Sequence, residues 1–357
     1  MKMSEMVLLG LKHAKNTFAE DIYLRYRYDM TKPITFYALI NERCNAKCLM
    51  CNFYRRDKYL DEMTLEEWQR ALLSLKKFVG KFSISFSGGE PFLRKDFIDL
   101  LEWCNRNGIM AGATTNGSLL NEDNVKKIVS AKPFNINISV DAPNADVHDY
   151  LRGVPGLFDS LNKGITHLVK ERERQGIYFP ITIKPTINAL NYQYLPELVE
   201  WTKRIGATNL SPQTMNRRTP ECDELWIDES ALPKFENVIN QLIIMKRKGE
   251  PIQTSESVLA LMPEHFKGVR ASRKLSPCLI GLRNFEIGTN GDVYSCGNFA
   301  SIGNIKEQSA RNIWNSPKAR RIRNDTVSCE KLCLVTCMSH KKLKDKIKMG
   351  LQLMRKN

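Results

Sequence analysis

Apolar residues follow two alternating periods between residues 34 and 215. Short apolar or alternating runs predict strands, and longer runs with apolar positions three and four residues apart predict amphipathic helices. The predicted strands span residues 34–40, 82–86, 110–115, 134–140, 178–187 and 208–212, with helices between them. This alternation predicts right-handed βαβ units and a parallel sheet. Chemistry in such sheets lies at the carboxyl ends of the strands.

The alternation stops near Met215. A loop is expected over 214–229, a lone helix over 232–248 and an irregular bridge over 251–276. The pattern therefore predicts five segments: an N-terminal extension (1–33), an α/β core (34–215), a helical bridge (216–276), a cysteine-rich module (277–340) and a basic C-terminal tail (341–357).

The composition is that of a folded globular protein, with 42% hydrophobic and 26% charged residues among 357. No apolar run approaches the roughly 20 residues of a membrane span, and none near the start matches a signal peptide, so we expect a cytoplasmic protein. The net charge of +15 favours acidic partners, among them phosphorylated molecules and anionic membranes. No specific nucleic-acid motif is present.

Most of the ten cysteines are clustered, which without a secretory signal indicates metal rather than disulfides. Cys44, Cys48 and Cys51 form a C-x3-C-x2-C loop directly after the first predicted strand. Three thiolates can hold three irons of a [4Fe–4S] cluster, which normally takes four cysteines, so one iron would stay open. A zinc site with a fourth ligand from elsewhere is the alternative.

This loop resembles that of the radical S-adenosylmethionine (radical SAM) enzymes. The resemblance implies a partial (β/α)6 TIM-like barrel over 34–215, followed by a small auxiliary-cluster domain, and SAM bound to the open iron. It also implies that the GGEP-like segment after the second strand binds the SAM ammonium. A TNG-like turn after the third strand is a further match, and the resemblance implies that a serine and an arginine hold the SAM carboxylate. The matching residues are Gly88, Gly89, Glu90, Pro91, Asn116, Ser139 and Arg152.

One position departs from the family pattern. Many members have an aromatic residue just before the last cysteine of the loop, near the adenine, where this chain has Met50. A methionine can pack on a purine. Aromatic stacking would then come from Phe53 or Tyr54.

The second cysteine cluster resembles the SPASM and twitch modules, which bind auxiliary iron–sulfur clusters. Cys278 and Cys296 flank a predicted hairpin whose turn is Asn290-Gly291. The resemblance implies a second [4Fe–4S] cluster, and we expect Cys278, Cys296, Cys333 and Cys337 as its ligands, with Cys329 as the spare thiol. Two incomplete clusters and a structural zinc site are the alternatives.

The resemblance implies reductive cleavage of SAM to a 5′-deoxyadenosyl radical, fed by an electron donor such as flavodoxin or ferredoxin. The expected substrate is a small polyhydroxylated molecule, such as a sugar or aminocyclitol, which is oxidised or epimerised. This expectation rests on the short auxiliary module and on a first segment of 33 residues, too short for a leader-binding domain. Maturation of a ribosomally made peptide and a non-catalytic iron–sulfur scaffold are the alternatives.

Two further features remain open. Cys222 lies after the last predicted strand and is a candidate hydrogen-atom donor, whereas Cys104, amid apolar helix positions, is expected in the core. The basic tail carries a stripe of four apolar residues, Leu343, Ile347, Leu351 and Met354. We expect this stripe to pack on the barrel, with contact to a membrane surface as the alternative.

Overall fold

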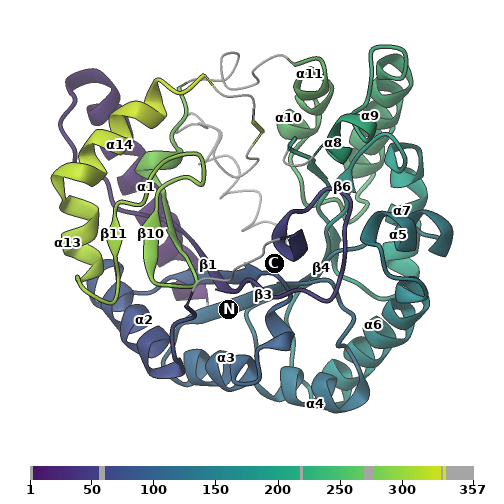
Figure 1. Cartoon of the computed structure of the whole chain (residues 1–357), viewed down its shortest axis with the longest axis horizontal. Helices are drawn as coiled ribbons and strands as arrows, with labels where there is room; N and C mark the ends of the chain where they lie inside the picture. The colour runs from purple at the N-terminus through teal and green to yellow at the C-terminus, as the bar shows by residue number, and fades with distance from the viewer. Residues whose placement is uncertain (1–2, 56–60, 218–219, 269–276, 331–332, 335–357) are drawn as a thin grey trace.

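The computed structural model describes residues 3–55, 61–217, 220–268, 277–330 and 333–334. The predicted tail and Cys337 lie outside the described residues. Figure 1 shows a curved row of helices around an inner sheet, open on one side. No helix in the described part of the chain is long and apolar enough to cross a membrane.

Six parallel strands lie next to one another in the sheet in chain order, with the last of them at the sheet edge. They are β1 (Thr35–Asn41), β2 (Ser83–Gly88), β3 (Met110–Thr115), β4 (Ile136–Ile138), β5 (Ile181–Ile183) and β7 (Asn209–Leu210). The helices that connect them are α2 (Leu65–Val79), α3 (Phe97–Arg106), α4 (Glu122–Ser130), α6 (Leu157–Arg174) and α7 (Leu195–Arg204). The predicted partial barrel is therefore confirmed.

Short polar signals fix the ends of several helices. Thr64 and Glu67 form the expected capping box at the start of α2, since each side chain accepts from the backbone N–H of the other. The helix α5 (Ala145–Arg152), which was not predicted, begins at Asn144, whose side chain accepts from Val147 N, and ends at Gly153 with a φ of +62°. Such a left-handed φ suits glycine.

The predicted strand 178–187 is wrong in its length. The structure has β5 and a separate β6 (Thr186–Ile187), which pairs with β8 (Gln213–Thr214) in a second small sheet. Pro185 lies between β5 and β6 and has no N–H to donate to a ladder. The chain therefore leaves the main sheet at this proline.

The region after the barrel contains more helix than expected. Its helices are α8 (Glu221–Glu224), α9 (Leu232–Arg247), α10 (Glu256–Leu259) and α11 (Met262–Phe266). The predicted lone helix matches α9, whereas the expected loop contains α8 and the irregular bridge contains α10 and α11. These three helices have four or five residues each, which is too short for apolar periodicity to show.

The C-terminal module continues the barrel sheet. β9 (Asn284–Ile287) pairs parallel with β1, β10 (Asp292–Tyr294) pairs antiparallel with β9, and β11 (Gly303–Asn304) pairs with β10. Two helices follow, α13 (Ala310–Asn315) and α14 (Pro317–Val327). The module is thus joined to the first barrel strand by a continuous sheet.

The N-terminal helix α1 (Met3–Tyr26) packs against this module, as Figure 1 shows. Tyr23 forms a hydrogen bond with Asn324 at 2.5 Å, and Asp29, just beyond the helix, forms an ion pair with Arg323 at 2.7 Å. The Trp314 indole N–H donates to the carbonyl oxygen of Thr31. The two ends of the described chain therefore support each other.

Candidate functional site

The three-cysteine loop lies where β1 ends, at the carboxyl edge of the sheet. Cys48 is buried, whereas Cys44 and Cys51 are half-buried. Two backbone hydrogen bonds hold the loop against the end of α5: Lys47 N donates to the Arg152 carbonyl oxygen, and Leu49 N to that of Leu151. The helix that sequence reasoning missed thus positions the loop.

Two glycines bring the end of β2 against the same loop. A Cβ added to Gly88 would lie 2.1 Å from the Asn41 carbonyl oxygen, and one added to Gly89 would lie 2.0 Å from that of Arg43. Instead, Gly89 N donates to the Asn41 oxygen and Glu90 N to the Arg43 oxygen. No residue with a side chain fits this approach, so the glycines are required by packing.

Glu90 is fully buried, and its carboxylate connects the end of β2 to the end of β3. Its carboxylate accepts hydrogen bonds from Thr115 Oγ1 and Asn116 N, both at 2.7 Å, and from Phe92 N at 3.1 Å, the last within the turn η2 (Pro91–Leu93). Burial raises the pKa of Glu90 to about 7, against the lowering effect of these donors. The carboxylate is therefore already engaged by protein groups, and it positions the GGEP-like segment next to the turn after β3.

Asn116 connects that turn to the cysteine loop. Its Nδ2 lies 3.8 Å from Cys44 Sγ and 2.9 Å from Asn45 Oδ1. Its Oδ1 accepts from Ser118 N at 2.9 Å and Ser118 Oγ at 2.6 Å. Asn116 is 7% exposed, so its amide is held by protein groups on both sides.

Arg152 lies beside a second cysteine of the loop. Its Nε is 2.7 Å from Asp141 Oδ2, and its Nη1 is 3.8 Å from Cys48 Sγ. Burial opposes the charged form, but Asp141 and Cys48 raise the pKa of Arg152 overall. Its Nη2 is buried without a hydrogen-bond partner among the described residues. That N–H group is available to an anion.

His148 supports Asp141 and was not assigned a role from the sequence. Its Nδ1 accepts a hydrogen bond from Asp141 N at 3.1 Å, which requires an imidazole without a proton on Nδ1. Burial lowers the pKa of His148 to about 4. Asp141 Oδ1 also accepts from Thr186 N, at the start of β6.

Two of the three thiols in the loop, those of Cys44 and Cys48, have raised pKa values. Burial raises the pKa of Cys44 to about 11, and the thiols of Cys48 and Cys51 add to this. Burial also raises the pKa of Cys48, although Arg152 opposes the shift. Thiols with raised pKa values hold their protons at neutral pH, and metal binding releases them. The donor set fits a cluster held by three cysteines.

The remaining SAM-site candidates lie around this loop. Met50 and Phe53 are half-buried, and Phe53 starts the turn η1 (Phe53–Arg55). Arg55 forms an ion pair with Glu221 of α8 at 2.7 Å, so the segment after the cysteines reaches the far side of the barrel. Ser139 directly follows β4, is half-buried, and donates its backbone N–H to Thr115.

Several polar side chains line the concave face of the sheet. Apolar strand residues such as Ile84, Phe86 and Ala113 are fully buried in the core under the helices. Successive side chains of a strand point to opposite faces, so the residues between them face the barrel interior. Along β2 to β5 and just after β7 these are Ser85, Ser87, Thr114, Asn137, Thr182 and Ser211. The barrel can therefore surround a molecule rich in hydrogen-bonding groups.

Three cysteines of the second cluster come together in the C-terminal module. Burial raises the pKa of Cys296, and the neighbouring thiols of Cys278 and Cys329 raise it further. Cys329 follows α14, and its backbone N–H donates to the Thr326 carbonyl oxygen. Cys333 is half-buried. The expected spare thiol, Cys329, is thus a neighbour of the hairpin cysteines.

The two isolated cysteines are in the core. Cys104 of α3 and Cys222 of α8 are both fully buried. Burial raises the pKa of Cys104 to about 12. A hydrogen-atom donor must reach the substrate, and the burial of Cys222 does not favour that role.

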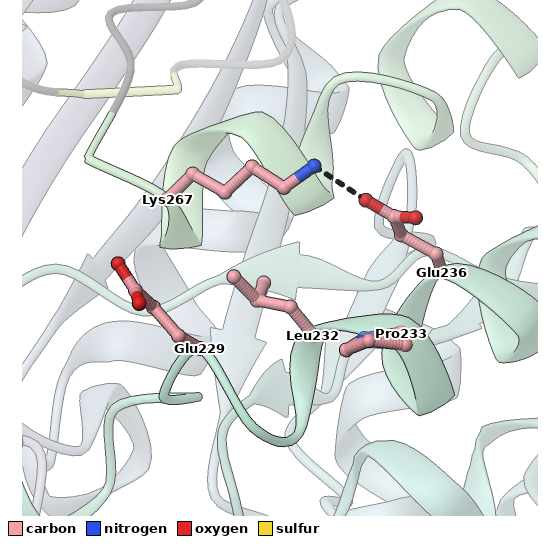
Figure 2. A pocket seen from close by; sticks show the side chains of 5 residues that line it. All are labelled: Glu229, Leu232, Pro233, Glu236 and Lys267. Atoms are coloured by element: carbon pink, nitrogen blue, oxygen red, sulfur yellow. Dashed lines mark hydrogen bonds and ion pairs between the residues drawn. The ribbon is translucent and has the colours of Figure 1, made fainter.

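A shallow hollow lies apart from these residues. Figure 2 shows Leu232 and Pro233 at the start of α9, with Glu229, Glu236 and Lys267 around them. Lys267 Nζ is 2.6 Å from Glu236 Oε1. The hollow contains none of the residues assigned to the site from the sequence.

A partial barrel with three cysteines after its first strand, and with further cysteines that flank a hairpin beside that strand, defines an iron–sulfur protein with two cluster-binding regions. The model of the radical SAM superfamily matches residues 39–201, and that of the SPASM iron–sulfur cluster-binding domain matches residues 278–338. The chain belongs to the radical SAM superfamily, in its SPASM branch, and is a radical SAM enzyme. The family implies SAM and [4Fe–4S] clusters as its cofactors.

The chain is similar to two curated proteins over most of its length. It is 26% identical to the AdoMet-dependent heme synthase of Methanosarcina barkeri, covering 79% of this chain and 82% of that protein. It is 23% identical to the mycofactocin maturase MftC of Mycobacterium tuberculosis, covering 84% and 75%.

The fold is also that of a solved structure, Streptococcus suis SuiB bound to its precursor peptide SuiA. The TM-score is 0.66 at 19% identity, covering 88% of this chain and 71% of that one. At this identity the likeness supports the fold.

Proposed function

We propose that Cys44, Cys48 and Cys51 hold the SAM-binding [4Fe–4S] cluster, and that the enzyme uses it to abstract a hydrogen atom from a carbon of a polar substrate. When bound, the cluster and SAM supply a 5′-deoxyadenosyl radical after one-electron reduction. The observation that carries this proposal is the convergence of the GGEP-like segment, Asn116 and Arg152 on the three-cysteine loop.

The residues around the loop have separate roles in this proposal. Arg152, with a buried N–H group that lacks a partner, binds the SAM carboxylate together with Ser139. The Glu90 carboxylate already accepts hydrogen bonds from three donors. The SAM ammonium is therefore bound by backbone carbonyl oxygens of Gly88 and its neighbours, and Glu90 positions this segment. Met50 and Phe53 pack on the adenine.

Cys278, Cys296 and Cys329 supply three ligands of the auxiliary cluster. This assignment rests on the packing of Cys278 against the buried Cys296 and on the electrostatic interaction of Cys296 with Cys278 and Cys329. Cys333 or Cys337 completes a set of four. Substitution of each of these two cysteines in turn is the direct way to choose between them.

The polar concave face supports a substrate rich in hydroxyl or amide groups. A small polyhydroxylated molecule, such as a sugar or aminocyclitol, meets that requirement. A peptide also does, and the similarity to MftC and to SuiB, whose structure contains a precursor peptide, supports peptide maturation as the second candidate. The macrocycle of a tetrapyrrole is mostly apolar and fits a hydroxyl-lined wall less well, although a relative is named a heme synthase.

Iron analysis tests the cluster assignment. Anaerobic reconstitution should give about eight irons per chain, since each of two [4Fe–4S] clusters carries four. The triple variant Cys44→Ala, Cys48→Ala, Cys51→Ala should keep about four. A full iron load in that variant, or zinc in the purified protein, would contradict the proposal.

The substrate class is tested by deuterium transfer. The enzyme is reduced in the presence of SAM and either a panel of deuterated sugars and aminocyclitols or a panel of deuterated peptides. Deuterium in 5′-deoxyadenosine identifies the class from which hydrogen is abstracted. Cleavage of SAM without transfer from either panel would reject both candidate substrates.

A further inference from the structure

We infer that Asn116 and Arg152 donate N–H···S hydrogen bonds to Cys44 and Cys48 and thereby raise the reduction potential of the cluster that these cysteines hold. The inference rests on the proposed cluster at the three-cysteine loop. It assigns to the two residues a role in electron uptake that is separate from SAM binding.

The geometry places one donor at each of two cysteines. Asn116 Nδ2 lies 3.8 Å from Cys44 Sγ, and Arg152 Nη1 lies 3.8 Å from Cys48 Sγ. The two donors come from different elements, one after β3 and one at the end of α5. Both side chains are more than nine-tenths buried, so water does not weaken these contacts.

The orientation of the Asn116 amide follows from its partners. The Ser118 backbone N–H can only donate, and it lies 2.9 Å from Asn116 Oδ1, so this atom must be the oxygen. The other end of the amide is then the NH2 group, and it faces Cys44 Sγ and Asn45 Oδ1. The asparagine therefore presents a donor, not an acceptor, to the sulfur.

Arg152 is fixed in the same way. Its Nε faces Asp141 Oδ2, and Asp141 is in turn held by hydrogen bonds from Thr186 N and to His148 Nδ1. The guanidinium is rigid and planar, so its Nη1 is directed at Cys48. Neither donor needs to rearrange when the charge of the cluster changes.

Hydrogen bonds to the sulfurs of an iron–sulfur cluster are one of the means by which a protein sets its potential. One-electron reduction adds negative charge to the cluster and its thiolates, with no proton taken up. A fixed N–H group stabilises this added charge more than the oxidised form. Loss of either donor should therefore make reduction less favourable.

The test is an EPR-monitored redox titration of the reconstituted holoprotein without SAM. The signal that is absent from a Cys44→Ala variant belongs to the first cluster. Asn116→Ala and Arg152→Met should each make reduction of this cluster about tenfold less favourable, which is ~59 mV for a one-electron couple. Asn116→Asp, which keeps the shape but presents an oxygen to Cys44, should lower the potential further.

Asn45→Ala is the matched control. It removes a polar neighbour of Asn116 but no N–H group at a sulfur, so the potential should stay at the wild-type value. Equal potentials in the wild type, Asn116→Ala and Asn45→Ala would overturn the inference. An absent first cluster in the wild type would instead reject the proposed function.

A second measurement detects the Asn116 side-chain nitrogen at the cluster. The reduced holoprotein is labelled with ¹⁵N only in asparagine side chains, and hyperfine spectroscopy is applied to the first cluster. A ¹⁵N coupling that is present in the wild type and absent from Asn116→Ala supports the inference. If that variant does not assemble its cluster, a coupling in the wild type supports it. Absence of any coupling in the wild type would overturn the role of Asn116.

Discussion

The Glu20 carboxylate and the Arg283 guanidinium form a buried pair with two contacts. Arg283 Nε lies 2.6 Å from Glu20 Oε1, and Nη2 lies 2.7 Å from Oε2. Both side chains are at most 4% exposed, and Asn16 Nδ2 also donates to Glu20. The pair joins α1 to the residue before β9.

Removing one partner of this pair should strongly destabilise the fold. Glu20→Leu leaves a buried, unpaired guanidinium, and we expect a loss of about 3–5 kcal/mol in the free energy of unfolding. Denaturant unfolding measures it. Arg247→Ala breaks the exposed pair with Glu256 and should cost less than about 1 kcal/mol. The double variant Glu20→Leu, Arg283→Met should regain most of the lost stability. A double variant that is as unstable as Glu20→Leu would contradict this account.

Gly89→Ala should disrupt the SAM site. The new Cβ would lie 2.0 Å from the Arg43 carbonyl oxygen, so the backbone of the cysteine loop must shift. We expect SAM affinity to fall at least tenfold, measured by equilibrium binding to the reconstituted protein. Gly176→Ala is the control, because nothing lies within 4 Å of the Cβ that alanine would add. The left-handed φ of +62° at this position should lower the stability of that variant by about 1–2 kcal/mol. Equal affinity in the wild type and Gly89→Ala would show that the close approach is not required.

The sequence was most informative where function depends on neighbouring residues. The cysteine spacing, the glycine pair and the capping box at Thr64 are local, so they can be found without a structure. The partners of Glu90 were not visible, because Thr115 and Asn116 lie more than twenty residues away on another strand. The pairing of β9 with β1 and the meeting of Cys329 with Cys296 also depend on distant contacts. The long predicted strand covers β5 and β6 but is interrupted between them at Pro185, and it begins three residues too early.

His148 should stay neutral well into the acid range. Burial lowers its pKa to about 4, so between pH 6.5 and 4 the unfolded chain takes up a proton that the folded protein does not. The contribution of His148 to stability is therefore complete above pH 6.5 and falls as the pH decreases toward 4. NMR of ¹⁵N-labelled histidine in the oxidised holoprotein at pH 6 should show one neutral imidazole whose Nδ1 accepts a hydrogen bond. The signal is assigned to His148 by its absence from the His148→Phe variant. A titration midpoint near 6.5 would contradict the buried hydrogen bond to Asp141.

Arg152→Ala should weaken SAM binding while the iron content stays unchanged. Removing a buried charge partner from a carboxylate typically costs about 2–5 kcal/mol, which is well over tenfold in affinity. Equilibrium binding and iron analysis on the same sample separate the two effects. An unchanged SAM dissociation constant would move the carboxylate site away from Arg152 and Ser139.

The central claim is that the loop of Cys44, Cys48 and Cys51 supports reductive cleavage of SAM. The most direct test is to reduce the reconstituted protein with dithionite in the presence of SAM and to quantify 5′-deoxyadenosine and methionine. We predict both products in the wild type and in Cys296→Ala, and neither in Cys44→Ala, Cys48→Ala or Cys51→Ala. Continued formation of 5′-deoxyadenosine in the three loop variants, or none in the reconstituted wild type, would contradict the account.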